Sequence, residues 1–128
     1  MVSIRIVQTA LKRTWESNKN QGWVHTNPKD NKSSLISQLI YDIFGGEILK
    51  THKKRNWHFY NRINGERIDF STSERKRLSY GNHFEDIPAS IDEINNYFEQ
   101  EQYSPFYMRF IREFEETLGL DNFKSIAS

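Results

Sequence analysis

The sequence predicts an α+β domain in which helices pack on a small antiparallel sheet. Two aromatic and β-branched runs, residues 56–63 and 66–71, flank Asn64-Gly65, a pair that favours the positive φ angles of a two-residue hairpin turn. Before and after this hairpin, apolar side chains recur at three- and four-residue steps, as on one face of a helix. A chain of 128 residues fits one domain, so we expect residues 1–128 to form a single domain.

The first half of the chain predicts two helices and a strand. An apolar stripe predicts a helix over residues 3–16, and the polar stretch 17–32 that follows reads as a long loop containing Trp23. A second apolar face predicts a helix over 33–44, which Gly45-Gly46 ends because glycine readily adopts the left-handed conformation of a helix stop. Residues 47–51 read as a short strand, and the basic run 50–55 as a turn or a sheet edge.

After the hairpin, the pattern predicts two more helices. The polar stretch to residue 82 holds one expected helical turn at 74–78. Ser90-Ile91-Asp92-Glu93 is a capping box and predicts a helix over 91–101. Ser104-Pro105 predicts another helix start, with Ser104 as the cap and Pro105 in the first position, and this helix continues to Leu118 before Gly119.

Composition excludes several classes of site. The chain has no cysteine, which excludes disulfides, thiolate metal sites and a cysteine nucleophile. The four histidines, His25, His52, His58 and His83, show no ligand spacing, so we expect no metal and no cofactor. No apolar run approaches the length of a membrane helix and the N-terminus does not resemble a signal peptide, so we expect a cytoplasmic protein without a membrane partner.

Charge is unevenly distributed, although the net charge is only +1. Residues 50–77 hold nine Lys or Arg against three Asp or Glu, whereas residues 89–121 hold two against eight. The simplest interpretation is a pair of solvated faces that attract each other or a protein partner. Aromatic residues do not interleave with the basic runs at 50–55 and 75–77, which disfavours nucleic acid as the partner and leaves a weak nucleic-acid-binding module as an alternative.

The predicted hairpin brings a histidine near an aspartate. With a two-residue turn, Ile63 pairs with Glu66, and His58 and Asp69 become diagonal neighbours on the polar face of the hairpin. A histidine oriented by an aspartate is the base half of a nucleophilic triad, although such a pair on an outer face is commonly a solvated pair. The other face, with Trp57, Phe59, Asn61, Ile63, Ile68 and Phe70, is expected to be core.

Ser33 and Ser34 open the second predicted helix. A helix start offers free N–H groups and the positive end of a dipole, which would stabilise an anionic nucleophile or an oxyanion. Ser33 is therefore the candidate nucleophile, although a serine at this position is most often a cap.

These motifs, taken in order, resemble the YunG-like family of small bacterial proteins. The matching residues are Trp23, Asn27-Pro28, Phe44 to Leu49, His58, Asn61, Arg62 and Asp69. The family has Gly-Gln-Cys where this chain has Asn31-Lys32-Ser33. The resemblance covers residues 3–118 and implies a minimal papain-like fold, with a nucleophile on a helix followed by His and Asp on strands.

The resemblance implies a catalytic site at Ser33, His58 and Asp69, and binding residues at Trp23, Tyr60, Asn61 and Arg62. We expect a catalytically degenerate papain-like domain that keeps a His-Asp cleft and binds a peptide, an amide or a protein segment, because a hydroxyl in a site adapted to a thiol loses most activity. The alternative is a hydrolase or acyltransferase with Ser33, or a cysteine that Ser33 replaces, as nucleophile. His58 would then be the general base and Asp69 its orienting group, and the N–H groups of Ser33 and Ser34 would form the oxyanion site.

Overall fold

The computed structural model describes residues 4–20, 32–53, 56–71, 84–98 and 100–127. The chain divides into two compact units, which we call the helical unit (Met1–His25 and Glu101–Ser128) and the sheet unit (Thr26–Gln100). The expected α+β class is confirmed, with the elements in the order α1(Ile4–Asn20), α2(Lys32–Phe44), β1(Glu47–Lys53), β2(Asn56–Ile63), β3(Glu66–Ile68), β4(Ile87–Pro88), α3(Ile91–Ile94), a 3₁₀ turn (Asn95–Tyr97) and α4(Gln100–Ala127). The loop around Trp23 and the helical turn expected at 74–78 lie outside the described residues.

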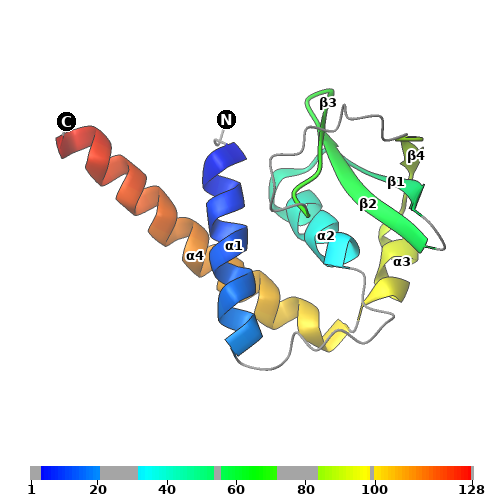
Figure 1. The fold of residues 1–128 in the computed structure, drawn as a ribbon, viewed down its shortest axis with the longest axis horizontal. Coiled ribbons are helices and arrows are strands. Elements are labelled where there is room, and N and C mark those ends of the chain that lie inside the picture. The colour runs from blue at the N-terminus through cyan, green and yellow to red at the C-terminus, as the bar shows by residue number, and fades with distance from the viewer. Residues whose placement is uncertain (1–3, 21–31, 54–55, 72–83, 99, 128) are drawn as a thin grey trace. The chain divides into compact units, whose positions relative to one another are not determined.

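The sheet unit is built on a four-stranded antiparallel sheet in the order β3-β2-β1-β4 (Figure 1). The predicted hairpin register is confirmed, because Ile63 pairs with Glu66, and Asn64 and Gly65 have φ angles of 51° and 80°. The second hairpin strand ends at Ile68, however, and not at residue 71 as predicted. Asp69 causes the difference, because its Oδ1 accepts hydrogen bonds from the N–H and the hydroxyl of Ser71, at 3.0 and 2.6 Å, and so turns the chain away from the ladder.

Strand β1 extends into the basic run 50–55, where we expected a turn or a sheet edge. It extends to Lys53 because its charged side chains find partners: Lys50 forms an ion pair with Glu93 and lies 4.3 Å from the centre of the Trp57 ring. The His52 ring lies against the Trp57 ring at a tilt, with centroids 3.8 Å apart, and His52 Nδ1 contacts Glu85 at 3.0 Å. β4, a two-residue strand that the sequence did not predict, pairs with Leu49 and Lys50 of β1.

Helix α2 lies against β2 (Figure 1). Small polar residues of the helix are buried as well as apolar ones. Ser33, Ser34 and Ser37 are all buried. The Ser33 hydroxyl accepts the N–H of Phe59 at 2.9 Å, and one helical turn later the Ser37 carbonyl accepts the Asn61 amide at 3.0 Å. The small side chains allow the helix to approach the strand backbone closely. The buried apolar residues of this unit are Leu35, Ile36, Leu39, Ile40, Ile48, Leu49, Phe59, Tyr60, Phe70, Ile94 and Phe98.

The connection from α2 to β1 depends on two glycines. Gly45 and Gly46 have φ angles of 78° and 84°, as expected for a helix stop. The Gly45 N–H closes the last turn on the Tyr41 carbonyl at 2.9 Å. A Cβ atom at Gly46 would lie 2.4 Å from the Arg62 carbonyl oxygen, so the chain passes β2 at a distance that only glycine allows.

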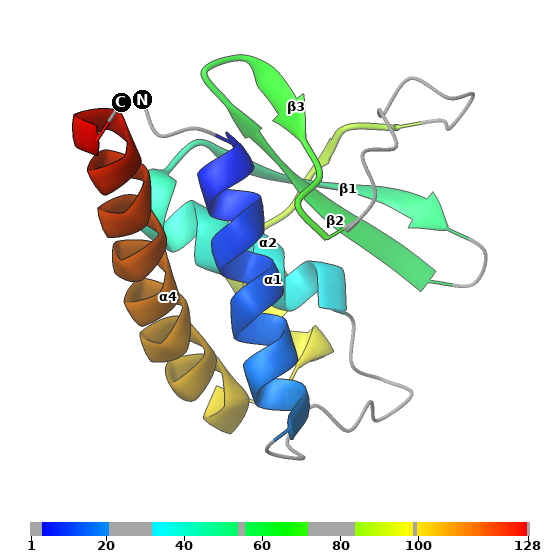
Figure 2. The ribbon, with the colours of Figure 1, turned by 60° about the vertical axis from the view of Figure 1, so that its left-hand side comes forward.

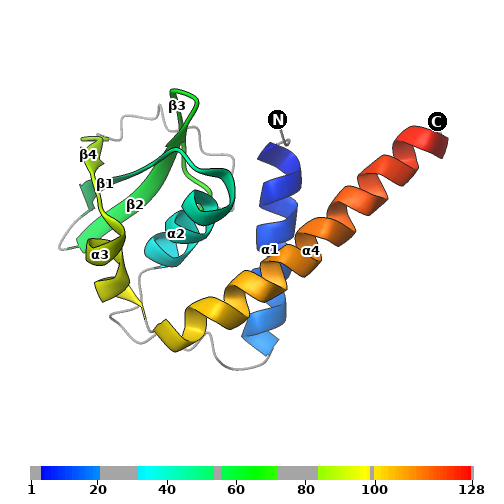
Figure 3. The same ribbon diagram turned by 180° about the vertical axis from the view of Figure 1, so that it is seen from behind.

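Helix α3 is shorter than the predicted helix over 91–101. The serine half of the capping box is confirmed, since the Ser90 hydroxyl accepts the Glu93 N–H at 3.1 Å, whereas the Glu93 carboxylate pairs with Lys50. The α-helical pattern ends at Ile94, a 3₁₀ turn follows, and Phe98 is extended with φ −152°. Figure 3 shows α3 beside α2, in agreement with the contacts between them.

The helical unit contains α1 and α4, which are both longer than predicted (Figure 2). The predicted start at Ser104-Pro105 is wrong, because α4 begins at Gln100 and includes Pro105. A proline near a helix start removes one backbone hydrogen bond, and the preceding residues still form the first turn. Trp15 packs edge-on against Phe106 at 6.1 Å, and Arg13 contacts Glu113 at 3.2 Å. No helix in the described part of the chain has the length and apolar character to cross a membrane.

Candidate functional site

The structure brings His58 and Asp69 into direct contact. His58 Nε2 lies 2.6 Å from Asp69 Oδ2. His58 lies on the face of the sheet opposite α2, which we call the outer face and which also carries Tyr60, Arg62 and Arg67. The turn after β3 places the Asp69 carboxylate against this histidine.

Asp69 is fixed and charged. Its side chain is 3% exposed, and burial by itself raises the pKa of the carboxyl group. The hydrogen bonds from His58 and Ser71 outweigh burial, so that the pKa of Asp69 lies below its usual value. The His58 side chain, 13% exposed, is therefore held at Nε2 by an anion. Within the described residues its other nitrogen, Nδ1, has no hydrogen-bonding partner.

Ser33 is attached to the strand next to His58. It lies inside the first turn of α2, which begins at Lys32, and it is 3% exposed. The Phe59 N–H donates to its hydroxyl. The ladder between β2 and β3 ends at the Asn61–Ile68 pair and does not reach Phe59. The Ser33 hydroxyl therefore takes the place that a carbonyl of a longer β3 would have. Through this hydrogen bond, Ser33 ties the first turn of the helix to the strand.

Three of the four expected binding residues lie in the described part of the chain, and their environments differ. Tyr60 lies on the outer face but is completely buried, so this face is not the open polar face that the sequence predicted. Asn61 is buried on the opposite face, against α2, in agreement with the expected core face. Arg62 forms an exposed ion pair with Glu47 at 2.6 Å, and Trp23 lies outside the described residues.

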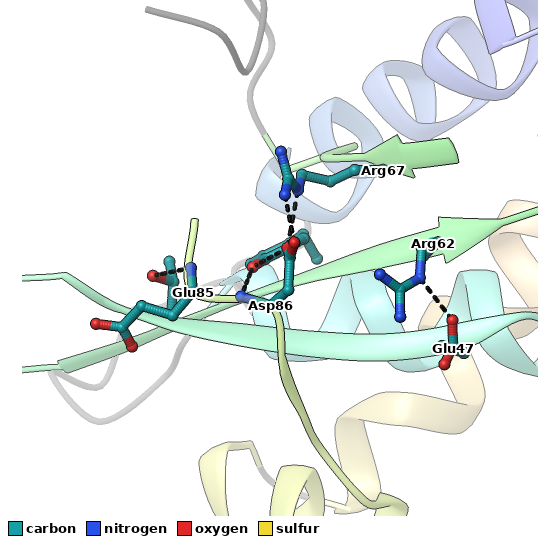
Figure 4. Close-up of polar contacts among 7 residues, drawn as sticks. Glu47, Arg62, Arg67, Glu85 and Asp86 are labelled. Carbon is teal, nitrogen blue, oxygen red and sulfur yellow. Dashed lines mark hydrogen bonds and ion pairs between the residues drawn. The ribbon is translucent and has the colours of Figure 1, made fainter. Parts of the chain in front are cut away.

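A second polar cluster on the outer face was not predicted (Figure 4). Arg67 binds the Asp86 carboxylate with two nitrogens, with Nε 2.8 Å from Oδ1. The Tyr60 hydroxyl donates to the same Oδ1 at 2.8 Å and accepts the Asp86 N–H at 2.8 Å. Burial and the hydrogen bond to Asp86 raise the pKa of Tyr60 above its usual value. Asp86 follows β2 by more than twenty residues in a polar stretch, and no local sequence signal identifies it as a partner.

The described residues do not assemble a metal site. Among them, no three His, Asp or Glu side chains converge in a way that could hold a metal ion.

The chain matches the family model described as "YunG protein" over residues 3–115. It is 34% identical over 106 residues to the YunG protein of Bacillus subtilis strain 168, an alignment that covers 83% of this chain and 90% of the relative. No solved structure matches the chain.

Proposed function

We propose that this chain, which belongs to the YunG family, is a non-catalytic binding domain of papain-like descent that engages a peptide or amide group through His58. The observation that carries the proposal is the contrast between two polar contacts. The His58–Asp69 pair is close and only partly buried, whereas the Ser33 hydroxyl is occupied by the Phe59 N–H.

The surroundings of Ser33 disfavour nucleophilic attack. A hydroxyl that accepts a backbone N–H has one lone pair engaged, and at 3% exposure it offers little access to a substrate carbonyl. A serine nucleophile also needs a base to remove its proton during attack, unlike a pre-ionised thiol. The position therefore suits a structural role better than turnover.

His58 keeps the features of a recognition group. Asp69 holds Nε2, which fixes the ring and leaves Nδ1 as the nitrogen available to a ligand. A fixed imidazole nitrogen can exchange a hydrogen bond with the N–H or C=O of a peptide group. This is the basis for a peptide, amide or protein segment as the bound group.

A serine hydrolase or acyltransferase is the second candidate. It is favoured by one observation, since Ser33 contacts the residue that follows His58 and lies in the first turn of a helix, where backbone N–H groups favour an oxyanion. The weak nucleic-acid-binding alternative finds less support, because Lys50 and His52 of the basic run are engaged by Glu93 and Glu85.

Binding and turnover can be measured together with a diverse peptide library and mass spectrometry. We expect enriched peptides to be recovered intact, with enrichment lost in His58→Ala and kept in Ser33→Ala. His52→Ala is the matched control, since it removes an exposed histidine from the same sheet. New peptide ends that disappear with Ser33→Ala or His58→Ala would instead establish the hydrolase, and enrichment that His58→Ala leaves unchanged would refute the proposed site.

Ser33→Cys tests the papain-like descent separately. We expect its thiolate, followed by ultraviolet difference absorbance, to form well below the ordinary midpoint of about 8.5, because the first turn of α2 and the Phe59 N–H favour a negative sulfur. The shift should shrink with His58→Ala. An ordinary midpoint that does not depend on His58 would mean that position 33 has only a packing role.

A further inference from the structure

We propose that the outer face of the sheet carries a carboxylate-binding site, formed by Arg67 and Tyr60, in which the chain's own Asp86 occupies the place of a partner's carboxylate. Figure 4 shows Arg67 directed at Asp86. The guanidinium donates from both Nε and Nη2, and the Tyr60 hydroxyl adds a third donor. A planar two-nitrogen contact supplemented by a hydroxyl is a general way to recognise carboxylates.

The groups around Asp86 favour the charged form of its carboxyl group. Arg67 is the main cause that holds the pKa of Asp86 below its usual value, and the charge of nearby Arg62 acts in the same direction. Arg62 is itself paired with Glu47. Arg67 and the buried Tyr60 hydroxyl therefore contact the Asp86 carboxylate, which the chain supplies from the segment before β4, and Arg62 adds only its charge.

Asp86 occupies this site at a conformational cost. Its φ angle is +55°, a left-handed conformation that is strained for residues other than glycine, although Asp tolerates it better than most. The hydrogen bond from its N–H to Tyr60 holds that conformation. We expect such backbone strain if Asp86 takes the place of a ligand among the donors of Arg67 and Tyr60.

The position of the cluster indicates what kind of partner it would bind. The rings of Tyr60 and His58 are stacked with centroids 6.3 Å apart, so the tyrosine that contacts the bound carboxylate also borders the His58–Asp69 pair. The inference rests on the proposed function for the partner class, which becomes a peptide with an acidic side chain or a free C-terminal carboxylate. In the wild type, Asp86 competes at a high effective concentration, so simple carboxylates should bind weakly.

Asp86→Gly tests the site, because glycine accepts the positive φ angle while removing the carboxylate. The probe is sodium acetate, compared with sodium chloride at equal ionic strength so that screening is matched. For a Kd of about 10 mM, acetate at about 50 mM stabilises the folded state about sixfold, which raises Tm by about 4 °C. Glu47→Ala is the matched control, since it removes a carboxylate from the other outer-face arginine pair and should respond to acetate like the wild type.

Two further variants keep the test decisive. In Asp86→Asn the neutral amide remains in the site, so the acetate response should lie between those of Asp86→Gly and the wild type. If Asp86→Gly does not fold, an acetate response of Asp86→Asn that exceeds that of the wild type decides the question. In the Asp86→Gly background, Arg67→Gln should abolish the response. A Tm shift in both Asp86 variants no larger than that of the wild type would overturn the proposal.

Two further ligands distinguish a chain terminus from an acidic side chain as the source of the carboxylate. N-acetylglycine represents a chain terminus and the α-amide of N-acetylaspartate represents an acidic side chain, and the larger Tm shift of Asp86→Gly identifies the favoured source. None of these measurements depends on Ser33 or His58. A failed acetate response would therefore reject the carboxylate site and leave the His58 proposal standing.

Discussion

Gly46→Ala should destabilise the sheet unit by about 2–4 kcal/mol, whereas Gly45→Ala, one residue earlier, should cost about 1 kcal/mol or less. Both glycines have positive φ angles, 78° and 84°, so both substitutions carry the same backbone strain of about 1–2 kcal/mol. Reduced freedom of the unfolded chain offsets about 0.4–1 kcal/mol of it in each case.

The two positions differ in the space available to a methyl group. At Gly45 a Cβ atom has nothing within 4 Å, but at Gly46 it lies 2.4 Å from the Arg62 carbonyl oxygen, well inside the 3.0 Å that real Cβ contacts respect. That oxygen belongs to a strand paired on both sides, so it cannot move alone. Forcing the two apart should add about 1–3 kcal/mol, as overpacking does in cores.

Urea unfolding followed by circular dichroism measures the difference between the two variants. Hydrogen exchange of β1 and β2 amides confines the comparison to the sheet unit. Equal losses for Gly46→Ala and Gly45→Ala would refute the argument, since they would mean that the close approach to Arg62 carries no free energy.

Three other perturbations have defined outcomes. The folded-state pKa of Asp69 is below its ordinary 3.8, so its contribution to stability is complete above about pH 4 and is lost as the pH falls through the folded value. Asp69→Asn should therefore weaken the loss of unfolding free energy at acid pH. An unchanged acid dependence would contradict the pairing with His58. Tyr60→Phe removes a hydroxyl that donates to Asp86 and accepts its N–H, so chemical denaturation should show a loss of about 1–3 kcal/mol, not a wild-type midpoint. Gly119→Ala, at an exposed helical site with nothing within 4 Å of the new methyl group, should raise the stability of the helical unit by about 0.5–1 kcal/mol, and a decrease in urea midpoint would count against it.

The hairpin and the His58–Asp69 contact could be predicted because their signals are local. Asn64-Gly65 sets the turn type, the turn sets the register, and the register brings Asp69, just after β3, near the part of β2 that carries His58. The end of α2 at Gly45-Gly46 is likewise encoded in two adjacent residues.

The features that could not be predicted depend on partners distant in the chain. Alternation along β2 implies one buried and one open face, but Tyr60 on the outer face is covered by Phe84, whose ring lies 5.0 Å from its own. Strand β4 has only two residues, too few to form a pattern, and it exists because β1 offers it an edge. At Ser104-Pro105 a local start signal was overridden by the helix that begins at Gln100.

The tie between Ser33 and Phe59 has a consequence for how such a domain can evolve. Position 33 must hold a small side chain that accepts a hydrogen bond, since α2 approaches β2 closely there. Serine meets this need, and a cysteine of the kind that the family resemblance implies would meet it less well, because sulfur is a weak acceptor. Replacement of the thiol by serine would therefore not destabilise the fold and could even stabilise it. A lineage can thus lose the nucleophile at this position while the fold persists.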